Sequence, residues 1–320
     1  MRVAAIMVVT VFGAGCTGLT RYEQSAAQLG EAATLGASAA RGALGGAREA
    51  CRMRAWLHAV SDRFERPGYP LGTDPLAVSS GVARAGGGTL TWGEYCSTLA
   101  SQDEAVLTAL SALEAYAAAL KAVAAQPAAL DTTLVTALAT DVDGLAAAVG
   151  GSSTAVQAVS APAGELARVV LEVVRTRRLR DAVRAGEGPL ERLLAGLDAY
   201  LDAAVLELQD ARSLAVAVTR EADAAIPVRS PGGRVPPELP GQALALYEFS
   251  RVELARLDAA EAQLAATRKL LGALREAHGK LAQGARAGSS EVEVSRYVAG
   301  KLGEIVSQVI VLRRLDWRNP

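Results

Sequence analysis

The sequence contains few aromatic residues for its apolar content. Aromatics make up 4% of the 320 residues although 51% are hydrophobic, so the apolar content consists mainly of Ala, Val and Leu. β-Sheets are enriched in aromatic and β-branched side chains, whereas close helix packing suits this composition. The composition therefore predicts an all-α protein.

A large excess of charge of one sign is also missing. The 33 basic and 34 acidic residues give a formal net charge of −1, whereas nucleic-acid-binding domains commonly carry a strongly basic surface. The one dense basic cluster comprises Arg175, Arg177, Arg178, Arg180 and Arg184. We interpret it as the solvated C-terminal end of a helix, where cations favour the dipole; the alternative is a patch for anionic lipid or nucleic acid. We expect no nucleic-acid partner.

Motifs for catalysis and for cofactor binding are lacking as well. The two histidines, His58 and His278, are not preceded by glutamate at the spacing that di-iron bundles use. The sequence has no cysteine pair with zinc spacing, no GxxxxGK[ST] phosphate loop and no Gly-x-Ser-x-Gly elbow. We therefore expect no enzymatic activity, no cofactor and no metal.

The most specific pattern lies at the N-terminus. A positive start is followed by an apolar run over residues 3–12 and by small residues before Cys16. This is the order of a secretory signal, and the run is shorter than the roughly 20 residues that a membrane-spanning helix needs. Ala14, Gly15 and Cys16 resemble the lipobox of bacterial lipoproteins, in which the cysteine is acylated and becomes the new N-terminus. Gly13 departs from that pattern, which usually has an aliphatic residue there.

The resemblance covers only the first 16 residues. It implies a signal peptide over residues 1–15 and a lipid on Cys16, with the membrane as a partner through that lipid. Thr17 stands directly after Cys16 in place of an acidic residue, which resembles the class of lipoproteins that is sorted to the outer membrane. We therefore expect a location in the cell envelope, at the outer membrane and facing the periplasm. The alternative is an ordinary signal peptide cut near Gly15, which would release a soluble exported protein.

The remaining cysteines, Cys51 and Cys96, form an even pair if Cys16 carries lipid. In an oxidising compartment such a pair predicts a disulfide, and closing the 45-residue loop would stabilise the fold by about 4 kcal/mol. The alternative is a catalytic thiol at Cys51. His58 lies two helical turns away, which is too far for a direct hydrogen bond within one helix, so we favour the disulfide.

Apolar residues recur three and four apart along most of the chain, which is typical of amphipathic helices. The pattern predicts helices over residues 24–63, 97 or 101–125, 129–149, 153–185, 189–225, 241–285 and 290–315. We expect the first helix to bend or break near Gly45, and Gly186 and Gly188 to separate two helices. Pro162 marks either a kink or a helix start.

These elements predict an elongated antiparallel helical bundle with long helices and coiled-coil-like seams. Residues 16–226 form a lipid-attached N-terminal region with a loop at 67–93, and residues 227–240 form a Pro- and Gly-rich connection. Residues 241–320 form a C-terminal helical hairpin that packs on the same bundle.

Three aromatic residues, Tyr69, Trp92 and Tyr95, lie in or beside the long first loop. We expect them to pin the loop to the bundle; the alternative is contact with a ligand or partner. Trp317, near the C-terminus, could either pack against the bundle or make a contact at an interface.

The anchor, the long helices and the absence of a recognisable site together favour a structural or protein-interaction role with an envelope protein partner. The runner-up is a soluble exported bundle that binds a small apolar ligand between its helices. An envelope enzyme that uses Cys51 with His58 is a third and weaker hypothesis.

Overall fold

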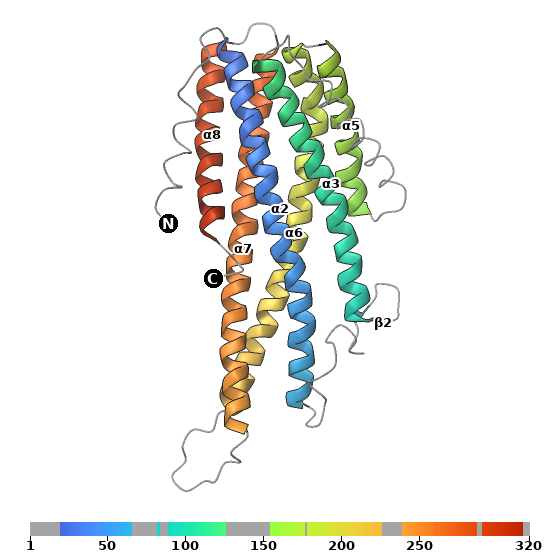
Figure 1. The fold of residues 1–320 in the computed structure, drawn as a ribbon, viewed down its shortest axis with the longest axis vertical. Helices are drawn as coiled ribbons and strands as arrows, with labels where there is room; N and C mark the ends of the chain where they lie inside the picture. Colours follow the sequence, from blue (N-terminus) through green and yellow to red (C-terminus); the bar gives the residue numbers. More distant parts are fainter. Residues whose placement is uncertain are drawn as a thin grey trace.

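The structure, a computed structural model, describes residues 20–65, 82–83, 89–125, 154–176, 178–225, 239–286 and 290–315. Six long helices make up almost all of this part of the chain: α2 (Arg21–Glu65), α3 (Trp92–Ala125), α5 (Thr154–Thr176), α6 (Leu179–Ala225), α7 (Leu239–Gly284) and α8 (Glu291–Arg314). A short antiparallel ribbon of β1 (Val82–Ala83) and β2 (Thr89–Leu90) precedes α3. The predicted all-α elongated bundle is confirmed (Figure 1).

The helices run side by side along the long axis of the molecule (Figure 1). The central helix is α2, which packs against α3, α6, α7 and α8. The helix α5 packs against α3 and α6. At one end of the bundle α5 and α8 complete the packing, whereas α2, α6 and α7 continue well beyond them toward the other end (Figure 1).

Small residues in α2 allow its neighbours to come close. A Cβ atom added at Gly30 would lie 2.5 Å from the carbonyl oxygen of Ala117 in α3. One added at Gly36 would lie 2.5 Å from a methyl carbon of Leu270 in α7. Because the Ala117 carbonyl is backbone and cannot move aside, glycine at position 30 sets how closely α2 approaches α3, whereas the Leu270 side chain could shift to admit a larger residue at position 36.

The expected break near Gly45 is wrong. The helix α2 continues through this position as one element of 45 residues. A glycine inside a helix is less favourable than alanine by about 1 kcal/mol. Leu44 before it and Ala50 and Cys51 after it are buried against other helices, so packing on both sides outweighs that local cost.

The boundary between α5 and α6 also differs from the prediction. The helix α5 begins at Thr154 and contains Pro162, while α6 begins at Leu179 and continues through Gly186, Gly188 and Pro189. Neither glycine separates two helices. Proline removes a backbone donor and crowds the preceding turn. The buried leucines that follow Pro189 in α6 hold it in the helix nevertheless.

The predicted loop and the predicted connection are both shorter than expected where the structure describes them. The helix α3 begins at Trp92, so the end of the predicted loop at 67–93 is helical, and α7 begins at Leu239, inside the predicted connection. The predicted helix over 129–149 lies outside the described residues, as do residues 227–238 of the connection.

The basic cluster spans the boundary between two helices: Arg175 lies in the last turn of α5, as predicted, whereas the rest of the described cluster lies at the start of α6. Arg180 and Arg184 lie in the first two turns of α6. Arg184 pairs with Asp181 at 2.9 Å, and Arg180 pairs with Glu291 of α8. The guanidinium of Arg180 also lies 4.9 Å from the ring centroid of Tyr22. Neighbouring acids and an aromatic ring, rather than the helix dipole, therefore stabilise these cations.

Ion pairs also fix the antiparallel register of α6 and α7. The pairs Glu187–Arg286 at 2.6 Å, Asp198–Arg268 at 2.8 Å and Arg212–Asp258 at 2.7 Å follow one another along the seam. Charged pairs flanking an apolar seam select one register over others.

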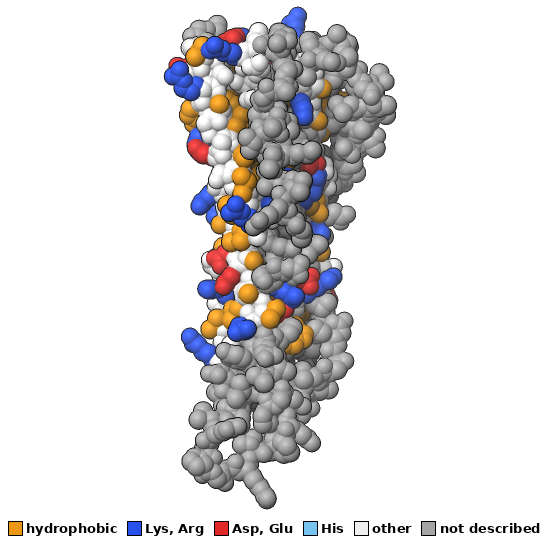
Figure 2. Space-filling model, turned by 60° about the vertical axis from the view of Figure 1, so that its left-hand side comes forward, with side chains coloured by type: hydrophobic (Ala, Val, Ile, Leu, Met, Phe, Trp, Pro, Cys, Tyr) orange, Lys and Arg blue, Asp and Glu red, His pale blue; other side chains and the backbone are white. Residues whose placement is uncertain are grey.

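Described side chains of both signs are interspersed along the face shown in Figure 2.

Candidate functional site

A disulfide joins Cys51 of α2 to Cys96 of α3, with an S–S distance of 2.04 Å. It is the pair that the sequence predicts. Cys51 is buried and Cys96 is half-buried. Because both sulfurs are in the bond, the structure holds no free thiol at Cys51 for nucleophilic catalysis.

The aromatic residues at the start of α3 pack onto α2. Trp92 is buried and stacks on His58, with ring centroids 4.9 Å apart. The guanidinium of Arg54 lies 5.2 Å from the Trp92 ring centroid, and Tyr95 meets that ring edge-on at 5.9 Å. These contacts fasten the start of α3 to α2. The predicted pinning of the loop lies outside the described residues.

Two carboxylates near the disulfide are each held by one tyrosine and one arginine. The first is Glu207 of α6, which accepts hydrogen bonds from the Tyr95 hydroxyl and from Arg54 Nη1, the latter at 2.7 Å. Burial and the hydrogen bond to Glu207 raise the pKa of Tyr95, so its hydroxyl remains a donor at neutral pH. We call these three residues the Glu207 triad.

The second carboxylate is Asp103 of α3, which is 5% exposed. It accepts hydrogen bonds from Arg48 Nε of α2 at 2.7 Å and from the Tyr200 hydroxyl of α6. Burial and the hydrogen bond to Asp103 raise the pKa of Tyr200. We call these three residues the Asp103 triad. Each triad connects α2, α3 and α6, so the two together hold the three helices in a fixed arrangement.

A cavity of about 650 Å³ lies between α2, α3 and α6 beside both triads. We call it the cystine cavity because Cys51 and Cys96 form part of its wall. Its volume is within the range of about 300–1,000 Å³ that is usual for ligand pockets. Its wall combines charges of both signs, including Glu49 and Arg52, with the small residues Ala203 and Ala204.

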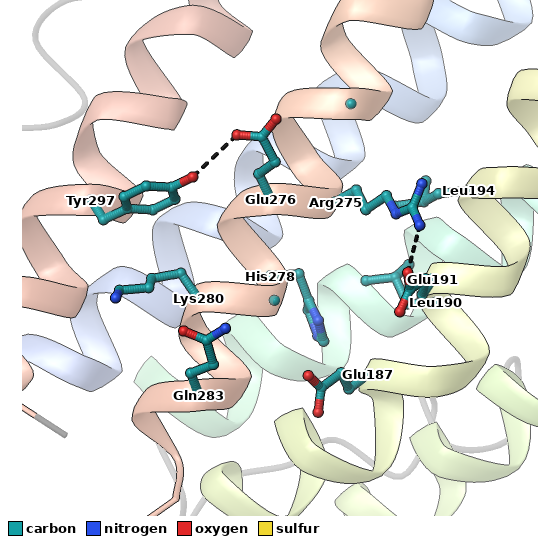
Figure 3. Close-up of a pocket in the computed structure, with 12 residues that line it drawn as sticks. Glu187, Leu190, Glu191, Leu194, Arg275, Glu276, His278, Lys280, Gln283 and Tyr297 are labelled. Carbon is teal, nitrogen blue, oxygen red and sulfur yellow. Dashed lines mark hydrogen bonds and ion pairs between the residues drawn. The ribbon is translucent and has the colours of Figure 1, made fainter. Parts of the chain in front are cut away.

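A second groove, of about 700 Å³, runs between α6, α7 and α8 (Figure 3). In this view Arg275 pairs with Glu191 across the α6–α7 seam. On the other side, the Tyr297 hydroxyl of α8 donates to Glu276 at 3.1 Å. Since these polar groups already bind one another, fewer of their hydrogen-bond donors and acceptors remain to recognise a ligand.

His278 contributes to the inner wall of this groove but is only 3% exposed. Its Nε2 is hydrogen-bonded to the hydroxyl of Tyr116 in α3 at 2.7 Å. Burial lowers the pKa of His278 to about 4, so the ring is neutral at pH 7. Nearby, the Tyr22 hydroxyl donates to the carbonyl oxygen of Leu281 at 3.2 Å. We call Tyr22, Tyr116 and His278 the buried tyrosine region.

Sequence reasoning identified Cys51 and Cys96 but missed both triads. Asp103 and Tyr200 are 97 residues apart in the chain, and no local pattern links them. One signal was present: Asp103 is three residues before Val106 on the buried stripe of α3. A carboxylate at such a position requires a partner, although the sequence does not reveal which one.

The described residues contain no group of three His, Cys, Asp or Glu side chains placed to hold a metal ion. Val106–Ala124 of α3 is long and apolar enough to cross a membrane, but more than half of it is buried in the bundle, as in a core helix.

Several residues singled out from the sequence lie outside the described residues, namely Cys16, Tyr69, Arg177 and Trp317. Lipid attachment at Cys16 therefore stays a prediction.

Comparison with known proteins leaves the function to be inferred from the residues themselves. The chain matches no family model, no curated protein and no solved structure.

Proposed function

We propose that this chain is a lipid-anchored protein of the bacterial cell envelope with a structural or protein-interaction role and no catalytic activity. The observation that carries the proposal is the lipobox-like sequence ending at Cys16, separated from α2 by only residues 17–20. Four extended residues span at most about 14 Å. A lipid on Cys16 would therefore keep the N-terminal end of α2 close to the membrane surface.

The length of the bundle suits a scaffold. At 1.5 Å per residue, the 45 residues of α2 extend about 67 Å from the anchored end. Cys51 is 30 residues beyond Arg21, so the cystine cavity would lie about 45 Å along the bundle from that end. An anchored protein of this shape presents its cavity to molecules well away from the lipid headgroups.

The alternative of a small apolar ligand has less support. Sites for such ligands are lined mainly by hydrophobic and aromatic side chains. Both cavities described above carry several charged side chains in their walls. A partner with charged groups of its own fits these walls better.

The anchor is tested by expressing the full precursor in a bacterium supplied with a clickable palmitate analogue. We expect label on the wild-type protein and its recovery with the outer-membrane fraction. Cys16→Ala should carry no label and leave the membrane fraction, whereas the neighbouring Thr17→Ala control should behave like wild type. An unlabelled wild type, or a Cys16→Ala protein that sediments as wild type does, would overturn the lipid anchor.

A further inference from the structure

The helix ends that lie nearest the predicted anchor form one end of the bundle. The helices α2, α6 and α8 begin there and α7 ends there, at the top of Figure 1. Contacts between these helix ends agree with that arrangement. The guanidinium of Arg180 lies over the ring of Tyr22, and the Tyr22 hydroxyl donates to the carbonyl oxygen of Leu281. We call this end of the bundle the anchored end.

A lipid on Cys16 would bring the anchored end to the membrane surface. Residues 17–20 separate Cys16 from α2, and four extended residues span at most about 14 Å. Attraction between exposed charges acts over about 8 Å at physiological salt. Long side chains that project from the anchored end would therefore come within the range at which charged headgroups attract them.

Exposed arginines gather at this end. Arg21 begins α2, Arg178 directly precedes α6, Arg180 and Arg184 lie in its first two turns, and Arg286 follows the end of α7. All five side chains are exposed. Three segments far apart in the sequence thus contribute to one basic surface. We call these five residues the end arginines.

The nearest carboxylates are already bonded within the chain. Asp181 is shared by two of the end arginines, Arg184 at 2.9 Å and Arg178 at 3.8 Å. Glu187 pairs with Arg286 at 2.6 Å. Because one carboxylate serves two guanidinium groups, positive charge at the start of α6 is only partly compensated.

The arginine is the outer member of two of these pairs. The side chain of Arg178 is 76% exposed and that of Asp181 is 51% exposed. For Arg286 and Glu187 the exposed fractions are 60% and 28%. Arg21 is exposed as well, and among the described side chains no ion pair engages it. A surface that approaches this end meets guanidinium groups first, and Lys and Arg side chains are prominent at the upper end of Figure 2.

Phosphate is the group that such a surface recognises. A guanidinium donates paired N–H groups to phosphate oxygens. A membrane leaflet presents many phosphates in one plane, and anionic lipids attract basic residues that lie near it. Because the end arginines come from three segments at one end of an elongated bundle, they suit a plane of phosphates better than a single small ligand.

We propose that the end arginines form a contact surface for the anionic phospholipid headgroups of the leaflet that holds the anchor. The contact is a second attachment beside the acyl lipid, and it directs the bundle away from the membrane. This inference rests on the lipid anchor of the proposed function. It selects the lipid alternative for the basic cluster of the sequence.

The test uses the disulfide-bonded chain from residue 16 onward with Cys16→Ser, so that neither an acyl group nor the signal peptide contributes to binding. Co-sedimentation is measured with vesicles of phosphatidylcholine alone and of phosphatidylcholine mixed with phosphatidylglycerol. We expect binding to the anionic vesicles to be stronger by about tenfold or more, and to be lost when salt is raised from about 0.1 M to about 1 M. Equal binding to the two kinds of vesicle, or no binding to either, would overturn the proposal.

Variants locate the contact on the chain. Arg21→Gln with Arg178→Gln should weaken binding to the anionic vesicles about tenfold. The matched control, Arg220→Gln with Arg251→Gln, removes two exposed arginines toward the opposite end of the bundle and should bind as wild type does. Equal weakening by the two glutamine pairs would mean that binding follows net charge alone, which contradicts a contact at the anchored end.

A lysine pair separates charge from unfolding. Arg21→Lys with Arg178→Lys keeps both positive charges and should retain most of the binding. If this pair bound as weakly as the glutamine pair, attraction to the headgroup charge would not be the cause.

Soluble glycerol phosphate distinguishes a membrane surface from a site for one phosphate. At the phosphate concentration of the vesicles it should leave binding unchanged, and displacement of the chain would count against a lipid surface. Acyl labelling of the wild type at Cys16 is scored separately. A failed vesicle test leaves the anchor standing, and an unlabelled wild type whose chain binds anionic vesicles loses the anchor alone.

Discussion

The buried tyrosine region and the cystine cavity use tyrosine hydroxyls in opposite ways. In the first, the Tyr116 hydroxyl is hydrogen-bonded to a neutral histidine, and both side chains are almost fully enclosed. In the second, Tyr95 and Tyr200 donate to carboxylates in the wall of a cavity. The same hydroxyl group seals a core in one place and positions a charge beside open space in the other.

The two regions differ in how far their side chains are enclosed. Tyr22, Tyr116 and His278 are each 3% exposed or less, although His278 also contributes to the wall of the groove between α6, α7 and α8. Around Asp103 and Glu207, the described residues that form the cavity wall come from α2, α3 and α6. A hydrogen bond from a tyrosine is therefore enclosed by packed side chains in the first region, and borders a cavity in the second.

Removing the disulfide should have the largest effect and tests what holds the cavity together. Replacing Cys51 and Cys96 by alanine frees a 45-residue loop, so the free energy of unfolding should fall by about 4 kcal/mol in guanidinium titrations. Wild type measured with a reductant should match the variant. A loss below about 1 kcal/mol would mean that the two triads and Trp92 already fix α3 on α2.

Crowding the buried tyrosine region should be nearly as damaging. In Gly186→Ala the new Cβ would lie 2.3 Å from the Tyr116 hydroxyl, and the enclosed ring has no room to move. We expect a loss of about 3 to 4 kcal/mol from overpacking and the broken hydrogen bond to His278. Gly42→Ala, where a Cβ meets nothing within 4 Å, should instead raise stability by up to about 1 kcal/mol. If the two substitutions changed the free energy of unfolding by similar amounts, the Tyr116 ring would not be tightly enclosed.

Acid should destabilise the buried tyrosine region through His278. Its pKa is about 4 when folded and 6.5 when exposed, so between these values the unfolded chain binds the additional proton. Stability is therefore fully present above pH 6.5 and falls as pH drops toward 4, by up to about 3 kcal/mol. His278→Gln does not titrate, so its stability should decline less over this window. Parallel pH profiles of the two proteins would rule out His278 as the cause.

Removing single hydroxyls compares the two regions directly and should have the smallest effects. Tyr116→Phe leaves His278 Nε2 unpaired in a closed core, for which we expect a loss of about 2 kcal/mol. Tyr200→Phe removes one donor from Asp103, but Arg48 remains and water can enter the cavity, so the loss should stay below about 1 kcal/mol. If Tyr200→Phe lost more stability than Tyr116→Phe in thermal or denaturant unfolding, the cavity wall would be less accessible to water than the buried tyrosine region.

The helical pattern of the sequence predicted α3, α6, α7 and α8 well at their C-terminal ends, because apolar spacing persists until a Gly- or Pro-rich segment stops it. The pattern failed at Gly45, Gly186 and Pro189 inside α2 and α6. Breakers cost about 1–3 kcal/mol locally. Whether a helix continues through them depends on the neighbours that pack on either side, and the local sequence does not contain these.

By itself, the sequence determined the helical class, the C-terminal ends of several helices and the pairing of Cys51 with Cys96, because composition, periodicity and cysteine number are properties of the chain alone. Only the tertiary structure decided that Asp103 meets Tyr200 and Arg48. The partners in these contacts are 55 and 97 residues apart. Contacts of that kind depend on which helices become neighbours, and packing of the whole bundle fixes the neighbours.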